Sequence, residues 1–107
     1  MAKKNDSRII LKIVKSYLNI LQENRIRIIR AYLFGSYAKN KFTKDSDIDL
    51  AIVSQDFKGD VIEDNLRLMR LRRSIDLRIE PHAFTPKEFS IHNPFVREIL
   101  KTAKRIA

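Results

Sequence analysis

Helix-like and strand-like patterns alternate along this chain of 107 residues, and the alternation limits the fold more than any other feature. Residues 7–22 carry apolar side chains three and four positions apart, which is the spacing of one helical face. Three later segments, residues 26–34, 47–53 and 74–81, are short, and their apolar, β-branched or alternating side chains predict strands. Helical patterns lie between and after these strands. The order predicts an α/β (α+β) domain in which helices flank a small mixed β-sheet.

The predicted helices carry local start signals. Asp6 or Ser7 can cap the first helix. The second runs over residues 60–73, and its expected buried side consists of Val61, Ile62, Leu66 and Met69. Pro86 and Pro94 each stand at the first position of a further predicted helix.

The composition fits one soluble domain over residues 1–107. Hydrophobic residues make up 44% of the chain and charged residues 33%, a balance typical of globular proteins rather than disordered ones. The lack of cysteine excludes a disulfide scaffold and a thiolate metal site, and it suits a reducing cytosol. Lys12, Lys15 and Asn19 interrupt the apolar stretch near the start, so we predict an amphipathic helix there and not a signal peptide. We expect a cytoplasmic protein with no membrane partner.

The chain is strongly basic, with 22 Lys and Arg against 13 Asp and Glu and a net charge of +9. Such an excess attracts polyanions: nucleotides, RNA or an acidic protein surface. Solubility alone would also explain it. The charge therefore does not choose among these classes.

Asp47 and Asp49 are two positions apart on a predicted strand, so both carboxylates leave the same face. Two like charges held side by side repel unless water solvates them or a cation lies between them. Oxygen ligands of this kind suit Mg²⁺, which binds a few carboxylates together with substrate phosphates. A solvated loop or a helix cap is the alternative for an isolated Asp-x-Asp.

Asp76 lies in the predicted strand over residues 74–81, where Arg78 and Glu80 would share its open face. If this strand neighbours the one that carries Asp47 and Asp49, the three carboxylates approach one another. Such a trio can hold two metal ions about 3.5–4 Å apart. An exposed strand residue is the alternative for Asp76 alone.

Gly35 and Ser36 follow a predicted strand, where the chain is about to begin a helical turn. Glycine lets the backbone approach a ligand closely, and free N–H groups with the Ser36 hydroxyl form an anion site. A phosphate site and a carboxylate pair on consecutive elements are what transfer from a triphosphate requires. An ordinary turn is the alternative for Gly-Ser alone.

The order strand, Gly-Ser, ten residues, Asp-x-Asp resembles the signature of the polymerase-β-type nucleotidyltransferase superfamily. It is carried by GSYAKNKFTKDSDID, from Gly35 to Asp49. The short chain and the later IDLRIEPHAF look like the minimal nucleotidyltransferase (MNT) subfamily, the antitoxins of HEPN/MNT toxin–antitoxin pairs. This resemblance covers roughly residues 7–104.

The resemblance implies that Gly35 and Ser36 bind the triphosphate of ATP and that Asp47, Asp49 and Asp76 bind Mg²⁺. It also implies that Asp76 deprotonates the accepting hydroxyl. The activity implied is transfer of AMP from ATP to a hydroxyl, expected to be a tyrosine of a partner HEPN-type toxin, in a type VII-like pair. The nucleotide, the acceptor, the number of groups transferred and the oligomeric state stay open at this point.

Several other residues have two interpretations each. Lys39, Lys41 and Lys44 either attract the triphosphate or form a solvated basic loop. Arg78 either contacts a phosphate or carboxylate, or pairs with Glu80. His82 either touches substrate or is a turn histidine. Asn40 stands where this subfamily commonly has glycine, and asparagine tolerates the left-handed conformation of such a turn.

Two other functions remain open for the whole chain. It could neutralise a toxin by contact alone, without catalysis. It could also be a basic nucleic-acid-binding module, although no motif that reads nucleic acid is recognisable.

Overall fold

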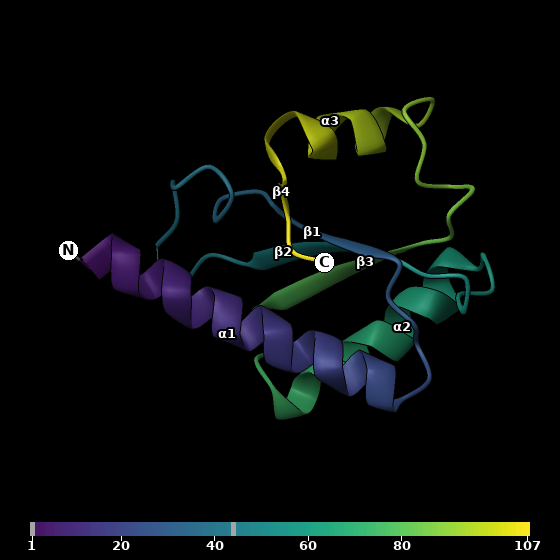
Figure 1. The fold of residues 1–107 in the computed structure, drawn as a ribbon, viewed down its shortest axis with the longest axis horizontal. Helices are drawn as coiled ribbons and strands as arrows, with labels where there is room; N and C mark the ends of the chain where they lie inside the picture. The colour runs from purple at the N-terminus through teal and green to yellow at the C-terminus, as the bar shows by residue number, and fades with distance from the viewer. Residues whose placement is uncertain (1, 44) are drawn as a thin grey trace.

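The computed structural model describes residues 2–43 and 45–107, with the side chains of residues 2–6 outside that description. The elements, drawn in Figure 1, are α1 (Ala2–Glu23), β1 (Arg30–Phe34), β2 (Ile48–Val53), α2 (Val61–Leu71), the 3-10 turn η1 (Arg72–Ser74), β3 (Ile79–Phe84), α3 (Pro94–Thr102) and β4 (Lys104–Arg105). The predicted fold class is confirmed.

The four strands form one mixed sheet in the order β3-β2-β1-β4. β1 is antiparallel to both β2 and β4, whereas β2 and β3 run parallel. A parallel pair needs a long crossover connection, and α2 supplies it between β2 and β3. In this register Asp49 is the Cα partner of Phe34 on one side and of Glu80 on the other.

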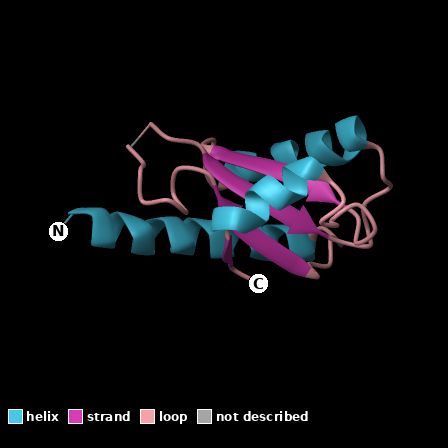
Figure 2. Ribbon diagram, turned by 90° about the horizontal axis from the view of Figure 1, so that it is seen from above, coloured by secondary structure: helices cyan, strands magenta, loops and turns pink. Residues whose placement is uncertain are grey.

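The helices cover the two faces of the sheet unequally, as Figures 1 and 2 show. α1 and α2 lie on one face, where Tyr17, Leu21 and Leu68 belong to the same buried cluster as Leu50 and Ile52 of the sheet. The other face packs against α3 in a second buried cluster of Tyr32, Ala51, Val53, Phe84, Phe89, Val96 and Ile99. Because side chains alternate along β2, Asp49 faces α3 together with Ala51 and Val53.

The buried side of α2 is not the one that the apolar pattern predicts. Val61, Ile62, Leu66 and Met69 are exposed at 59%, 74%, 47% and 38%, and the fully buried position is Leu68. Asp64 is also buried, because its carboxylate accepts hydrogen bonds from the backbone N–H groups of Lys58 and Gly59. The Tyr17 hydroxyl donates to the Leu68 carbonyl at 2.7 Å and fixes α1 against this side.

The predicted strand over residues 74–81 is wrong in its first half. Arg72–Ser74 form η1, and the Asp76 side chain accepts a hydrogen bond from the Arg78 backbone N–H at 2.8 Å. Such a local bond closes a turn in competition with the strand ladder. The Arg72 guanidinium donates to the carbonyls of Leu77 and Ile79 and holds this turn, so β3 begins at Ile79.

Two helix starts also differ from the prediction. α1 begins at Ala2, upstream of the expected caps at Asp6 and Ser7. The segment after Pro86 forms turns only, although Thr85 and Glu88 exchange the two hydrogen bonds of a capping box. The start at Pro94 is confirmed, with Asn93 as its N-cap.

None of the helices among the described residues is both apolar enough and long enough to span a bilayer.

The orientation of α2 can be tested by truncating one side chain on each of its sides. Leu68→Ala should lower the free energy of unfolding by about 2–5 kcal/mol, because it leaves a cavity in the core. Ile62→Ala, on the same helix, should change it by less than about 0.5 kcal/mol, because the side chain is exposed. Urea denaturation of both variants followed by circular dichroism provides the measurement. A larger loss for Ile62→Ala than for Leu68→Ala would contradict this orientation.

Candidate active site

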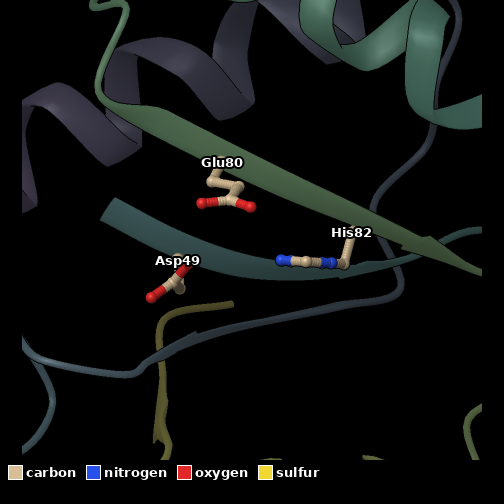
Figure 3. Close-up of side chains that lie close together, drawn as sticks. All are labelled: Asp49, Glu80 and His82. Carbon is tan, nitrogen blue, oxygen red and sulfur yellow. The ribbon is translucent and has the colours of Figure 1, made fainter. Parts of the chain in front are cut away.

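Asp49 and Glu80 lie side by side because β2 and β3 are parallel and in register at these positions. His82 follows two residues later on β3 and therefore shares the same face. Each of the three side chains offers one ligand atom, and these atoms all lie within 4.8 Å of one another. Figure 3 shows the two carboxylates and the imidazole close together beside β2 and β3. The sheet thus brings together three potential metal ligands.

Asp47 adds a further carboxyl group just before β2. Burial, a hydrogen bond with Asp47 and its negative charge all raise the pKa of Glu80, while Arg72 opposes the rise. Burial and the charges of Glu80 and Asp47 raise the pKa of Asp49 to about 6. The charges of Glu80 and Asp47 therefore make ionisation of Asp49 less favourable, and the charge of Asp47 does the same for Glu80. A divalent cation bound among Asp47, Asp49 and Glu80 would relieve this repulsion, so their chemistry fits Mg²⁺.

The Gly35-Ser36 turn lies directly beside this carboxylate group. Gly35 has a φ of +73°, and a Cβ built on it would overlap a carboxylate oxygen of Asp49 and lie 3.1 Å from its Cγ. Hydrogen bonds from the backbone N–H groups of Lys39 and Lys41 to the Gly35 and Ser36 carbonyls close the turn. Asn40 adopts a φ of 57°, as expected for an asparagine that replaces glycine. The candidate phosphate site therefore touches the candidate metal site.

Asp76 is not brought into this group. Its carboxylate pairs with Arg78, with 2.8 Å between Asp76 Oδ2 and the Arg78 NH2 nitrogen, and the hydrogen bonds from Arg78 lower the pKa of Asp76. Of the trio predicted from the sequence, Asp47 and Asp49 come together, and the third carboxylate beside them is Glu80. The alternation of Asp76, Arg78 and Glu80 was the only local signal for Glu80, and it favoured all three positions equally.

Two aromatic rings hold His82 in place. Its imidazole lies 5.3 Å from the Phe34 ring and 5.5 Å from the Phe95 ring, measured between ring centroids. The turn interpretation of this histidine is wrong, because it lies within β3. Burial lowers its pKa, which favours the neutral imidazole.

A cavity of about 300 Å³ opens on the other side of His82. It is lined by residues of α2, β3 and the segment before and within α3: Val61, Asn65, His82, Ala83, Phe84, Glu88, Asn93 and Phe95. Of the basic residues predicted around the phosphate site, Lys39 and Lys41 are exposed, and Lys44 lies outside the described residues.

Gly35→Ala should disrupt the site more than the fold. A methyl group at this position is strained by the positive φ and displaces the Asp49 carboxylate. We expect at least a tenfold loss of Mn²⁺ affinity, measured by electron paramagnetic resonance (EPR) with Mn²⁺ as a probe for Mg²⁺, about 1.4 kcal/mol. Gly59→Ala is the matched control, because Gly59 also has a positive φ but has nothing within 4 Å of its added Cβ. Equal metal affinities for both variants would refute the close approach.

The raised pKa of Asp49 predicts a pH dependence for the metal-free protein. The folded carboxyl binds its proton more tightly than the unfolded one, whose pKa is 3.8. The stability contribution is therefore complete below about pH 4 and is lost as pH rises through about 6. Asp49→Asn removes the contribution of Asp49 to this pH dependence and leaves the contribution of Glu80. In EDTA, the unfolding free energy of the variant should fall less steeply between about pH 4 and 7 than that of the unchanged chain. Parallel curves would contradict the assignment.

Known proteins resemble this chain in sequence and in fold. Two proteins of Methanocaldococcus jannaschii, each named "putative protein adenylyltransferase", are similar in sequence. One is 29% identical over 93 residues, which cover 86% of this chain and 88% of the relative. The other is 46% identical over 43 residues, and the match spans 39% of this chain and only 43% of that relative.

Solved structures share the fold. A crystal structure of a "putative nucleotidyltransferase" from Sulfolobus solfataricus has a TM-score of 0.69 at 18% identity, covering 98% of this chain and 86% of that one. A toxin–antitoxin crystal structure with AMP-PNP has a TM-score of 0.60 at 21% identity. The match covers 84% of this chain and 68% of that one. A crystal structure of a mutant of the MntA-HpeT toxin–antitoxin has a TM-score of 0.61 at 18% identity. The match covers 87% of this chain and 71% of that one.

The family model of the nucleotidyltransferase domain matches residues 14–106, which include the Gly35-Ser36 turn and every carboxylate discussed above. The predicted enzyme class is confirmed at this level. The chain belongs to the nucleotidyltransferase domain family.

Proposed function

We propose that this chain transfers AMP from ATP to a hydroxyl group of a partner protein in a Mg²⁺-dependent reaction, and so acts as the antitoxin of a toxin–antitoxin pair. The observation that carries the proposal is the contact between the Gly35 turn and the Asp49 carboxylate, with Asp47 and Glu80 beside them. The two M. jannaschii relatives, each named "putative protein adenylyltransferase", and the toxin–antitoxin neighbours support the substrate and partner classes.

In the proposed reaction, the turn at Gly35 and Ser36 binds and orients the triphosphate through backbone N–H groups and the Ser36 hydroxyl. Asp47, Asp49 and Glu80 would hold Mg²⁺, which supplies neutralisation of the phosphate charge and polarisation of the acceptor. The acceptor oxygen forms a bond to the α-phosphorus while the bond to the β-phosphate oxygen breaks. Pyrophosphate leaves, and the hydroxyl proton passes to a neighbouring carboxylate.

Glu80 is the better placed of two candidates for this proton. It shares the face of Asp49, beside the turn that is the candidate phosphate site. Asp76, the candidate from the sequence, carries a lowered pKa and is engaged by Arg78. In the proposed mechanism Asp76 therefore acts as a positioning residue: it fixes Arg78 and the turn that leads into β3.

In this proposal the acceptor belongs to a separate protein that docks on the domain, which the toxin–antitoxin neighbours support. We propose a HEPN-type toxin as the partner and a tyrosine as the acceptor, as the subfamily resemblance implies. The exposed apolar residues of α2, which include Ile62, Leu66 and Met69, offer a protein-binding surface. The same surface favours the second candidate function, a non-catalytic antitoxin that neutralises its toxin by contact.

Transfer of label from ATP separates these two functions. The purified chain is incubated with α-³²P-ATP, Mg²⁺ and a candidate toxin, and label on the toxin is measured after gel electrophoresis. Asp47→Asn should reduce the label at least 100-fold, about 2.7 kcal/mol of transition-state stabilisation, because a metal ligand is lost. Asp56→Asn is the matched control, because Asp56 pairs with Arg27 away from the site. Toxin neutralisation that survives Asp47→Asn would overturn the enzymatic proposal in favour of binding alone.

The third carboxylate can be identified with the same assay. Glu80→Gln should reduce both label transfer and Mn²⁺ affinity, because it removes a metal ligand. Asp76→Asn should reduce transfer with little change in Mn²⁺ affinity, because it disturbs Arg78 and not the ligand set. If Asp76→Asn weakened Mn²⁺ binding and Glu80→Gln did not, Asp76 would be the metal ligand, as predicted from the sequence.

A further inference from the structure

We infer that the His82 imidazole joins Asp49 and Glu80 as a nitrogen ligand of the bound metal, and that this nitrogen gives the site a preference for Mn²⁺ over Mg²⁺. The inference rests on the proposed metal-dependent function. To that function the inference adds a nitrogen ligand and a preference between Mn²⁺ and Mg²⁺.

The three ligand atoms lie close enough together for one ion to gather them. In an octahedral site with bonds of about 2.1 Å, neighbouring ligand atoms are about 3.0 Å apart and opposite ones about 4.2 Å. The candidate atoms of Asp49, Glu80 and His82 all lie within 4.8 Å of one another. Small side-chain rotations would therefore bring all three onto one ion.

The imidazole is oriented for this role by its surroundings. Phe34 of β1 and Phe95 of α3 contact the ring at centroid distances of 5.3 and 5.5 Å and limit its rotation. Figure 3 shows the ring extending from β3 toward Asp49, with a nitrogen at its leading edge. A ligand held this way loses little rotational freedom when it binds an ion.

The donor set decides which ion is preferred. Mg²⁺ favours oxygen ligands and gives up its water reluctantly, so an imidazole adds little to its affinity. Mn²⁺ binds carboxylates as Mg²⁺ does, but as a transition metal it also accepts an imidazole, and it keeps the six-coordinate geometry that triphosphate oxygens would complete. A tetrahedral Zn²⁺ site would leave less room for those oxygens. Two carboxylates and one imidazole therefore favour Mn²⁺ over Mg²⁺.

The test measures ion binding to the full chain without nucleotide. Free Mn²⁺ is quantified by EPR, and Mg²⁺ affinity is obtained by competition. His82→Phe removes the nitrogen but keeps an aromatic ring between Phe34 and Phe95. We expect it to weaken Mn²⁺ binding about tenfold or more and Mg²⁺ binding less than about threefold. Pulsed EPR of Mn²⁺ on the unchanged chain should show coupling to an imidazole ¹⁴N, and His82→Phe should abolish it.

His92→Phe is the matched control, because His92 is exposed on the segment before α3, and it should keep both the coupling and the affinities. Absence of ¹⁴N coupling on the unchanged chain would overturn the inference, as would an equal loss of Mn²⁺ and Mg²⁺ affinity in His82→Phe. The coupling measurement needs no variant, so it decides the question even if His82→Phe is unstable.

Failure of this inference is distinguishable from failure of the proposed function. Label transfer to a toxin without ¹⁴N coupling would refute only the role of His82. Coupling without label transfer to any candidate toxin would leave the metal site in place and refute the proposed transferase activity.

Discussion

Repulsion among Asp47, Asp49 and Glu80 is the interaction on which the site depends. The parallel register of β2 and β3 brings the last two together, and partial burial denies them full solvation. A protein without a ligand gains nothing from this arrangement, because neighbouring negative charges raise the pKa of Asp49 and of Glu80. The stability of the fold comes instead from the buried clusters on the two faces of the sheet. The carboxylates thus lower the stability of the unliganded protein locally, and a bound cation would offset this loss.

The two sides of these carboxylates differ. On the side of α3, Phe34 and Phe95 contact His82 and each other. Charges act more strongly on one another where apolar groups replace water. On the opposite side, Gly35 contributes only backbone to the neighbourhood of Asp49. A side chain at this position would occupy the space between the candidate phosphate site and the candidate metal site.

Local sequence patterns predicted those parts of the structure that local interactions determine. Gly35 follows one strand and Asp49 lies on the next. Both positions could be predicted, because strand alternation and glycine turns depend on only a few neighbouring residues. The position of Asp76 could not be predicted in this way, because a side-chain bond to the Arg78 backbone replaces the strand that the alternation favours. The orientation of α2 depends on the buried Asp64 carboxylate and on Tyr17 of another helix. Neither contact leaves a periodic signal.

The position of Glu80 follows from how α2 is fastened to β3. A slip of one residue in β3 would turn Glu80 and His82 to the opposite face of the sheet. Two side chains prevent it: Asn65 accepts a hydrogen bond from the Ala83 backbone N–H at 2.8 Å, and Arg72 donates to the Ile79 carbonyl at 2.7 Å. These anchors lie on either side of Glu80, and both come from the crossover that also follows Asp49 in the chain. The crossover that connects the two strands therefore sets the register that brings the candidate metal ligands together.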